Sequence, residues 1–238
     1  MRQAERKKLM TRDTLDRQIR ELLNELMTLG KMVQESTLGS VAALIRRDIE
    51  AARLLYIQDN LINQKRFEIE NAAIGTLATQ QPITAGDLRL LASILDVTTE
   101  IERMGDYAKG IAKICILLKD EPLIKPLDDI SSMADKTVDM LRRALDAFIA
   151  ADVETARAIP AEDDEVDEMY IAIYRQLAAL IHQDPNTIDQ VNILLWAAHN
   201  LERLADRVTN VCERTIYAYT GLLTEIKPSD DEIRGYKQ

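Results

Sequence analysis

The sequence predicts an all-α protein built from two repeated three-helix bundles, with six long helices in total. Apolar residues recur three and four positions apart along most of the chain, which is the period of an amphipathic helix. The 238 residues include only 8 Gly and 6 Pro, so few elements are interrupted. Apolar and polar residues do not alternate over any sustained stretch, so no β-strand is predicted. The third observation is an internal repeat, described below.

The breaks between the predicted helices are few. The segments 80–87 and 182–189 read as short turns that contain a proline. The segment 119–127 carries two prolines and is the best candidate for a domain boundary. We therefore expect a first repeat over residues 1–121 and a second over residues 122–238.

Between these breaks the apolar period continues without interruption. The stripe of the first helix is formed by Leu15, Ile19, Leu22, Leu26, Leu29 and Val33. The predicted helices cover residues 12–46, 48–80, 84–119, 128–150, 152–182 and 187–224. Neither Gly nor Pro marks the junctions near Arg47 and Ala151. Pro160 should kink or begin the fifth helix.

The second half of the chain repeats the first. Residues 41–69 match residues 145–173 at an offset of 104. After the proline turn the offset falls to 100, so the turn of the second half is four residues shorter. At that offset the matched positions are Glu102, Arg103 and Asp106 with Glu202, Arg203 and Asp206. The repeat indicates a duplicated three-helix unit, and it supplies two copies of whatever these carboxylates do.

Composition and charge exclude several classes of protein. The net charge of −10 argues against nucleic-acid binding, which requires a basic surface. No apolar run approaches the length that spans a bilayer, and no signal-peptide pattern is present. Cys115 and Cys212 occupy apolar helical positions, so we expect reduced, buried thiols. These features together predict a soluble cytoplasmic protein.

A Glu and an Asp four positions apart on a helix usually face water or pair with Arg and Lys. Glu202 differs because it lies about 40° from Ala198 around the helix, on the rim of the apolar stripe. In an antiparallel hairpin, residues equally far from the turn face each other. Asp163 with Asp206, and Asp167 with Glu202, share a midpoint at the turn between residues 184 and 185.

The first half shows the same relation. Asp59 with Asp106, and Asn63 with Glu102, share a midpoint between residues 82 and 83, which is again the turn. Each hairpin should therefore hold two four-spaced pairs at one height. Because Asn63 replaces a carboxylate, the first cluster should bind a cation more weakly than the second.

Carboxylates at one height repel unless a cation lies among them. Oxygen ligands suit hard or borderline cations such as Mg²⁺, Mn²⁺, Ca²⁺ or iron. We therefore predict two metal sites, and their ligands are Asp163, Asp167, Glu202 and Asp206, and Asp59, Glu102 and Asp106. The spacing leaves a second interpretation open, in which Arg103, Arg203 and Arg207 neutralise the acids through salt bridges.

Evidence for catalysis is weak. His199 and Glu202 reverse the Glu-x-x-His order of bundle di-iron enzymes, and His199 reads as a helix-surface residue. No phosphate-binding glycine loop, Cys-x-x-Cys pair or nucleophile elbow is found. We therefore predict no catalytic and no organic cofactor-binding residues.

The stretches "NLERLADRVTNV" and "IERMGDYAKGI" resemble the repeated motif of the PhoU family of phosphate-signalling proteins. The resemblance extends to Arg103, Arg203 and Asn210 and to the acidic "EDDEVD" that holds Asp163 and Asp167, and it covers nearly the whole chain. Gly110 stands where Asn210 stands in the other copy, a departure that, like Asn63, affects the first site.

The resemblance implies a cytoplasmic regulator that restrains phosphate uptake and the phosphate-starvation response. Such proteins are thought to link the ATPase subunit of a phosphate ABC transporter to a membrane sensor histidine kinase. The resemblance also implies homodimers, contact with the membrane only through partners, and bound iron, zinc, manganese or magnesium. Two alternatives remain: a metal-free helical scaffold whose acidic face docks a basic partner surface, and a carboxylate-metal enzyme.

Overall fold

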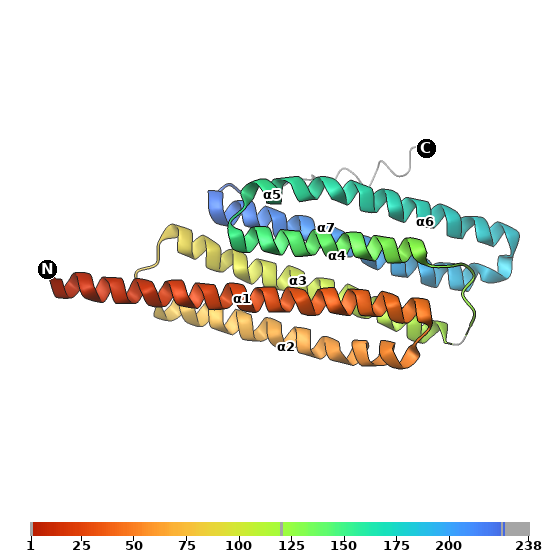
Figure 1. The fold of residues 1–238 in the computed structure, drawn as a ribbon, viewed down its shortest axis with the longest axis horizontal. Coiled ribbons are helices and arrows are strands. Elements are labelled where there is room, and N and C mark those ends of the chain that lie inside the picture. Colours follow the sequence, from red (N-terminus) through yellow and green to blue (C-terminus); the bar gives the residue numbers. More distant parts are fainter. Residues whose placement is uncertain (1, 120, 225, 227–238) are drawn as a thin grey trace.

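The computed structural model describes residues 2–119, 121–224 and 226, with side chains from residue 12 onward (Figure 1). Every regular element in these residues is helical, which confirms the predicted fold class. The α-helices are α1 (Arg2–Arg46), α2 (Ile49–Thr79), α3 (Ala85–Leu118), α4 (Asp128–Ala150), α5 (Val153–Ala158), α6 (Asp163–Gln183) and α7 (Ile188–Thr220). Two short 3₁₀ turns are η1 (Ile159–Glu162) and η2 (Pro185–Thr187).

The helices form two bundles that lie side by side along their length (Figure 1). In the first bundle α1, α2 and α3 pack on one another, and in the second α7 packs on α4, α5 and α6. The bundles join where α1 packs against α4 and α3 against α7. Within the described residues, no helix combines the length and the apolar character needed to cross a membrane.

The core consists of aliphatic side chains on the inner faces of these helices. Both cysteines are buried and unbonded to each other, as expected from the sequence. The Cys115 thiol donates to the carbonyl oxygen of Ala43 over 3.4 Å. Burial raises the pKa of the Cys212 thiol to about 12, which keeps it protonated and unreactive.

The two junctions without glycine use the same turn in both bundles. Arg47 and Ala151, which are 104 positions apart, adopt left-handed φ angles of 56° and 58°. In each junction the next residue is an aspartate that closes the turn and begins a helix. The amide of Asp48 donates to the oxygen of Ala43 over 2.9 Å, and its carboxylate accepts from the amide of Ala51. Asp152 repeats this N-cap in the second bundle, where it accepts from Thr155.

Two predicted boundaries were wrong, and the fifth helix is interrupted near Pro160. Helix α1 begins at Arg2 rather than near residue 12, because residues 2–11 are rich in helix-forming side chains. Helix α7 ends at Thr220 rather than residue 224, because Gly221 adopts a left-handed φ of 76°. The expected fifth helix is broken into α5, η1 and α6, and Pro160 lies in the 3₁₀ turn between them.

Gly105 of α3 packs against Ile62 of α2, so the side-chain size tolerated at one position should depend on the other. A methyl group added at Gly105 would lie 3.1 Å from an Ile62 carbon, whereas the second bundle holds Ala205 and Val166 at the equivalent positions. We expect Gly105→Ala to lower the free energy of unfolding by about 1 kcal/mol, since overpacking outweighs the gain in helix propensity. Adding Ile62→Val, which removes the Ile62 Cδ1 atom 3.2 Å from the added methyl group, should restore part of that loss in urea unfolding. Independent, additive effects of the two substitutions would contradict this coupling.

Candidate functional site

The second carboxylate cluster lies where the start of α6 faces the middle of α7. Asp163 is the first residue of α6 and is buried, with 3% of its surface exposed. Glu202 on α7 is also largely covered, with 22% of its side chain exposed. The broken fifth helix contributes to this placement, because η1 ends at Glu162, immediately before Asp163.

The four predicted ligands of this cluster act on one another electrostatically. Burial is the largest cause that raises the pKa of Glu202 to about 7, and the negative charges of Asp206, Asp167 and Asp163 contribute in that order. The charge of Arg203 opposes this shift. At neutral pH the Glu202 carboxyl is therefore divided between its neutral and ionised forms, in a setting that disfavours more negative charge.

His199 is closer to this cluster than the sequence suggested. Its Nδ1 atom lies 3.2 Å from Oε2 of Glu202, although its side chain is half exposed, as a helix-surface residue would be. Among the described residues, no group donates a hydrogen bond with good geometry to that buried oxygen. Burial lowers the pKa of His199, as does the charge of Arg203, so the imidazole is neutral at pH 7 and can act as a ligand.

The first cluster contains its own cations. The Nζ atom of Lys109 lies 2.7 Å from Oδ2 of Asp59, which is almost fully buried. The amide of Asn63 donates to the same oxygen over 3.1 Å. Arg66 reaches Glu102 over 3.0 Å. These ion pairs cancel much of the negative charge that the hairpin brings together.

Asp106 completes the first cluster. Although it is exposed to solvent, loss of part of its hydration raises its pKa, and the charge of Asp59 adds to this shift. Lys109 and Arg66 act in the opposite direction. The shared midpoint at the turn predicted that Asp106 and Asp59 lie close together, and the charge of Asp59 does act on Asp106. The pairing of Lys109 and Arg66 with this cluster was not predicted from the sequence. Their spacing could have indicated this pairing. Arg66 lies seven residues after Asp59 and Lys109 lies three after Asp106, so each cation is on the same helix face as the acid before it.

The second cluster differs at both of these positions. Tyr170 stands where the first bundle has Arg66, and Thr209 stands where it has Lys109. The first cluster therefore has one carboxylate fewer, because of Asn63, and two more cations, Arg66 and Lys109. Both differences leave the second cluster with more uncompensated negative charge than the first.

The competing salt-bridge interpretation was only partly right about its partners. Arg103 and Arg207 approach the same carboxylate, Glu100, over 3.1 and 3.4 Å. Arg203 lies 3.9 Å from Asp206, a member of the second cluster. The acids of the first cluster are neutralised instead by Arg66 of α2 and Lys109 of α3.

The donor atoms of the second cluster fit a divalent cation in their chemistry: carboxylate oxygens with one neutral imidazole nearby. Across the described residues, however, no three His, Cys, Asp or Glu side chains already converge as a metal site. A bound cation would require new rotamers of these side chains. Glu202, whose burial disfavours its ionised form, is the residue that a cation would affect most.

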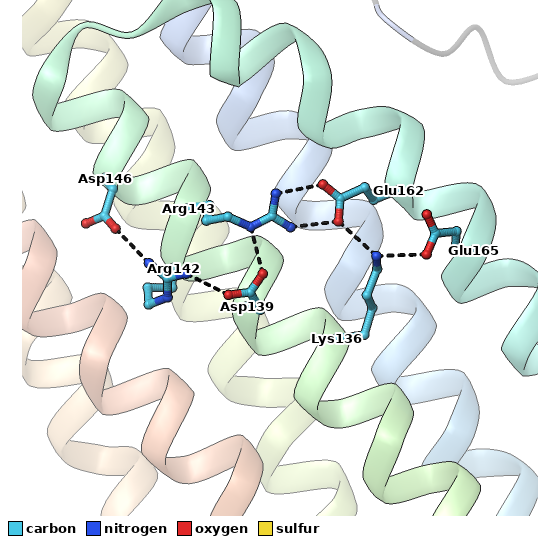
Figure 2. A network of polar contacts seen from close by, with 7 residues as sticks. All are labelled: Lys136, Asp139, Arg142, Arg143, Asp146, Glu162 and Glu165. Carbon is cyan, nitrogen blue, oxygen red and sulfur yellow. Dashed lines mark hydrogen bonds and ion pairs between the residues drawn. The ribbon is translucent and has the colours of Figure 1, made fainter.

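An ionic network fixes the start of α6 beside this cluster (Figure 2). Arg143 of α4 donates two hydrogen bonds to Glu162, of 2.6 and 2.7 Å, and this pair holds the pKa of Glu162 down at about 2. Lys136 bridges Glu162 and Glu165 over 2.9 and 2.8 Å. The network extends to Asp139, Arg142 and Asp146. Because Glu162 precedes Asp163, these bonds limit where the Asp163 carboxylate can lie.

Comparison with known proteins gives a consistent result. The family model of the PhoU domain matches residues 26–115 and again residues 130–215. The chain is 34% identical over 212 residues to the "Phosphate-specific transport system accessory protein PhoU homolog" of Clostridium acetobutylicum, covering 89% of this chain and 97% of that protein. It is 32% identical over 207 residues to the accessory protein PhoU of Escherichia coli K12, covering 86% and 84%.

Solved structures agree with these sequence relatives. The crystal structure of the phosphate transport system regulatory protein PhoU from Streptococcus pneumoniae matches with a TM-score of 0.82 at 31% identity, covering 89% of this chain and 99% of that one. PhoU from Pseudomonas aeruginosa matches with a TM-score of 0.81 at 30% identity, covering 87% and 99%. These relatives are named accessory and regulatory proteins, not enzymes. With both of its halves matched and its bundles superposable on these structures, the chain belongs to the PhoU family.

Proposed function

We propose that this chain is a metal-binding adaptor that restrains phosphate uptake and phosphate-starvation signalling. Its partners in this proposal are the ATPase subunit of a phosphate ABC transporter and a sensor histidine kinase, both met at the cytoplasmic side of the membrane. The names of the relatives support a place in the phosphate-specific transport system. The observation that carries the metal assignment is the largely buried Glu202 carboxyl, whose pKa is raised by its burial and by the charges of three other acids.

In this proposal Asp163 and Asp167 of α6 and Glu202 and Asp206 of α7 hold the cation, with His199 as an additional nitrogen donor. A bound cation supplies positive charge that allows all four carboxylates to ionise while close together. Iron, zinc, manganese and magnesium all suit these donors. The first site uses Asp59, Glu102 and Asp106, and it is weaker because Lys109 and Arg66 already offset part of its charge.

The surface of α2 supports a role in binding other proteins. Leu54, Ile57 and Leu61 form a stripe on its outer face and are 61%, 62% and 54% exposed. The second bundle has Ala158, Ala161 and Glu165 at the equivalent positions, so the stripe is not required by the fold. An exposed apolar stripe of this kind is typical of a protein-binding face, used here for a transporter or kinase partner or for the second copy in a homodimer.

The metal-free scaffold remains a second candidate for one specific reason. In the first bundle Lys109 and Arg66 neutralise an acidic cluster without any metal. A basic side chain from a partner protein could do the same for the second cluster. Metal analysis separates these two functions.

Removing Glu202 and Asp206 together should abolish most metal binding. After chelation and reloading, elemental analysis of Glu202→Ala with Asp206→Ala should show a large loss, and Glu102→Ala with Asp106→Ala a smaller one. Glu50→Ala with Glu154→Ala is the control for lost charge, because it removes two exposed carboxylates that lie outside both clusters. A wild-type protein with no metal above trace would sink the proposal, as would equal content in all variants.

The reverse experiment gives the first cluster the residues of the second. Asn63→Asp, Arg66→Tyr and Lys109→Thr together remove two positive charges and add one carboxylate. We expect this variant to bind additional metal, and the addition should disappear with Glu102→Ala. Unchanged metal content in a folded variant would show that the two cations are not what weakens this site.

Without metal, Glu202 should make the stability of the protein fall as pH rises. Its pKa is raised in the folded state, to about 7 from 4.5, so the stabilising protonated form is fully populated below about pH 4.5 and is lost as pH rises through 7. In chelator-treated protein, Glu202→Gln should be more stable than wild type by roughly 1–3 kcal/mol at pH 8, and nearly equal to it near pH 4.5. Urea unfolding at both values measures this. Glu102→Gln, which loses the ion pair with Arg66, should show no such gain; equal gains would refute the assignment.

The adaptor role predicts binding through the α2 stripe. Purified chain should capture the transporter ATPase or the sensor kinase at high or low phosphate, and Ile57→Glu with Leu61→Glu should weaken capture by placing charge in an apolar contact. Ala161→Glu, at the position equivalent to Ile57, is the matched control. Failure of the wild type to bind either partner at both phosphate levels would contradict the proposal.

A further inference from the structure

The outer seam between α3 and α7 gathers three arginines around one tyrosine. The two helices run antiparallel here, since Asn210 donates to Glu100 over 2.9 Å and Arg214 lies 3.4 Å from Asp96. The residue numbers of both pairs sum to 310. The same register places Arg103 level with Arg207 and Tyr107 level with Arg203. We call the four residues Arg103, Tyr107, Arg203 and Arg207 the seam cluster.

Two of these arginines lie beside the same neutral oxygen. The register places Tyr107 level with Arg203 and one helical turn from Arg207, and its side chain acts on both guanidinium groups. A phenol oxygen accepts hydrogen bonds but carries no charge, so it brings two guanidinium groups together without cancelling their repulsion.

Anionic partners cover only part of this charge. The Glu100 carboxylate contacts Arg103, Arg207 and Asn210 at the same time, at distances of 3.1, 3.4 and 2.9 Å. Asp206 lies 3.9 Å from Arg203, beyond hydrogen-bond distance. The Nε atom of Arg207 is buried and has no acceptor among the described residues. Each guanidinium has five N–H donors, so donors exceed acceptors in the seam cluster.

The cluster is also open to solvent on one side. The side chains of Arg103 and Arg203 are 51% and 40% exposed, and that of Arg207 is 20% exposed. Half-buried arginines fixed by their neighbours lose little freedom when they bind an anion. Their planar forks match the oxygen atoms of phosphate, which can accept from several guanidinium groups together.

We propose that the seam cluster is a binding site for a small phosphate-type oxyanion. The anion accepts hydrogen bonds from Arg103 and Arg203 at the surface, and its charge offsets the repulsion between Arg203 and Arg207. The anion's donors are arginines and not the carboxylates of either cluster, although Asp206 of the second cluster lies 3.9 Å from Arg203. Occupancy of the site therefore does not require the metal of the proposed function.

Calorimetric titration of inorganic phosphate into the chelator-treated full chain tests this inference. Ionic strength is held constant with chloride, so that a general salt effect is subtracted. We expect saturable binding at millimolar or lower phosphate, and about tenfold weaker binding in Arg203→Ala and in Arg103→Ala, since each loses charged hydrogen bonds. Arg142→Ala, which removes the same charge from an exposed arginine of α4, should bind as the wild type does.

Tyr107→Phe distinguishes a binding site from a purely structural cluster. The variant keeps all three guanidinium groups but removes their neutral acceptor, so phosphate affinity should be retained or increased. Absence of saturable binding by the wild type would overturn the inference. Equal weakening by Arg142→Ala and Arg203→Ala, or loss of binding in a folded Tyr107→Phe, would do the same. Because metal is removed in every arm, these outcomes are independent of the metal-content results.

Discussion

Repulsion between carboxylates that a helix hairpin holds at one height is the constraint on which this molecule depends. Each bundle places acids from two helices at the rim of the core, where water only partly screens their charge. Such a cluster must recruit cations, remain partly protonated, or move apart. The first bundle recruits Lys109 and Arg66. The second keeps Glu202 partly protonated at neutral pH.

The duplicated fold makes this difference informative. The same turn and N-cap, at Asp48 and Asp152, begin the second helix of each bundle. That helix then runs unbroken past Asp59 in the first bundle, but it is interrupted by η1 just before Asp163 in the second. The side chains around the two clusters differ as well. The second bundle has the Arg143–Glu162 pair at the start of α6, and the first bundle has an apolar outer stripe on α2. In the function that we propose, the second half holds the charged ligand and the first half contacts a protein.

Much of this could be predicted from the sequence, because the informative signals are periodic. The apolar stripes and the repeat offsets specify the helices, and midpoints at the turns specify which acids face each other. The break at η1 was foreseen only in part, since Pro160 can either start or kink a helix. Lys109 and Arg66 were missed because ion pairing depends on rotamers of long side chains, for which sequence spacing gives only weak evidence. The seam cluster was not predicted either. Its residues come from α3 and α7, which belong to different bundles and are not joined by a short turn that would fix their register.

The most direct test of the account is the titration of the Glu202 side-chain carboxyl by carbon NMR, without and with added Zn²⁺. Without metal, we expect a pKa of about 7, and with metal a value below the ordinary 4.5, because the cation favours the ionised form. A pKa near the ordinary value that does not change when Zn²⁺ is added would contradict the claim that this cluster holds uncompensated charge for a cation.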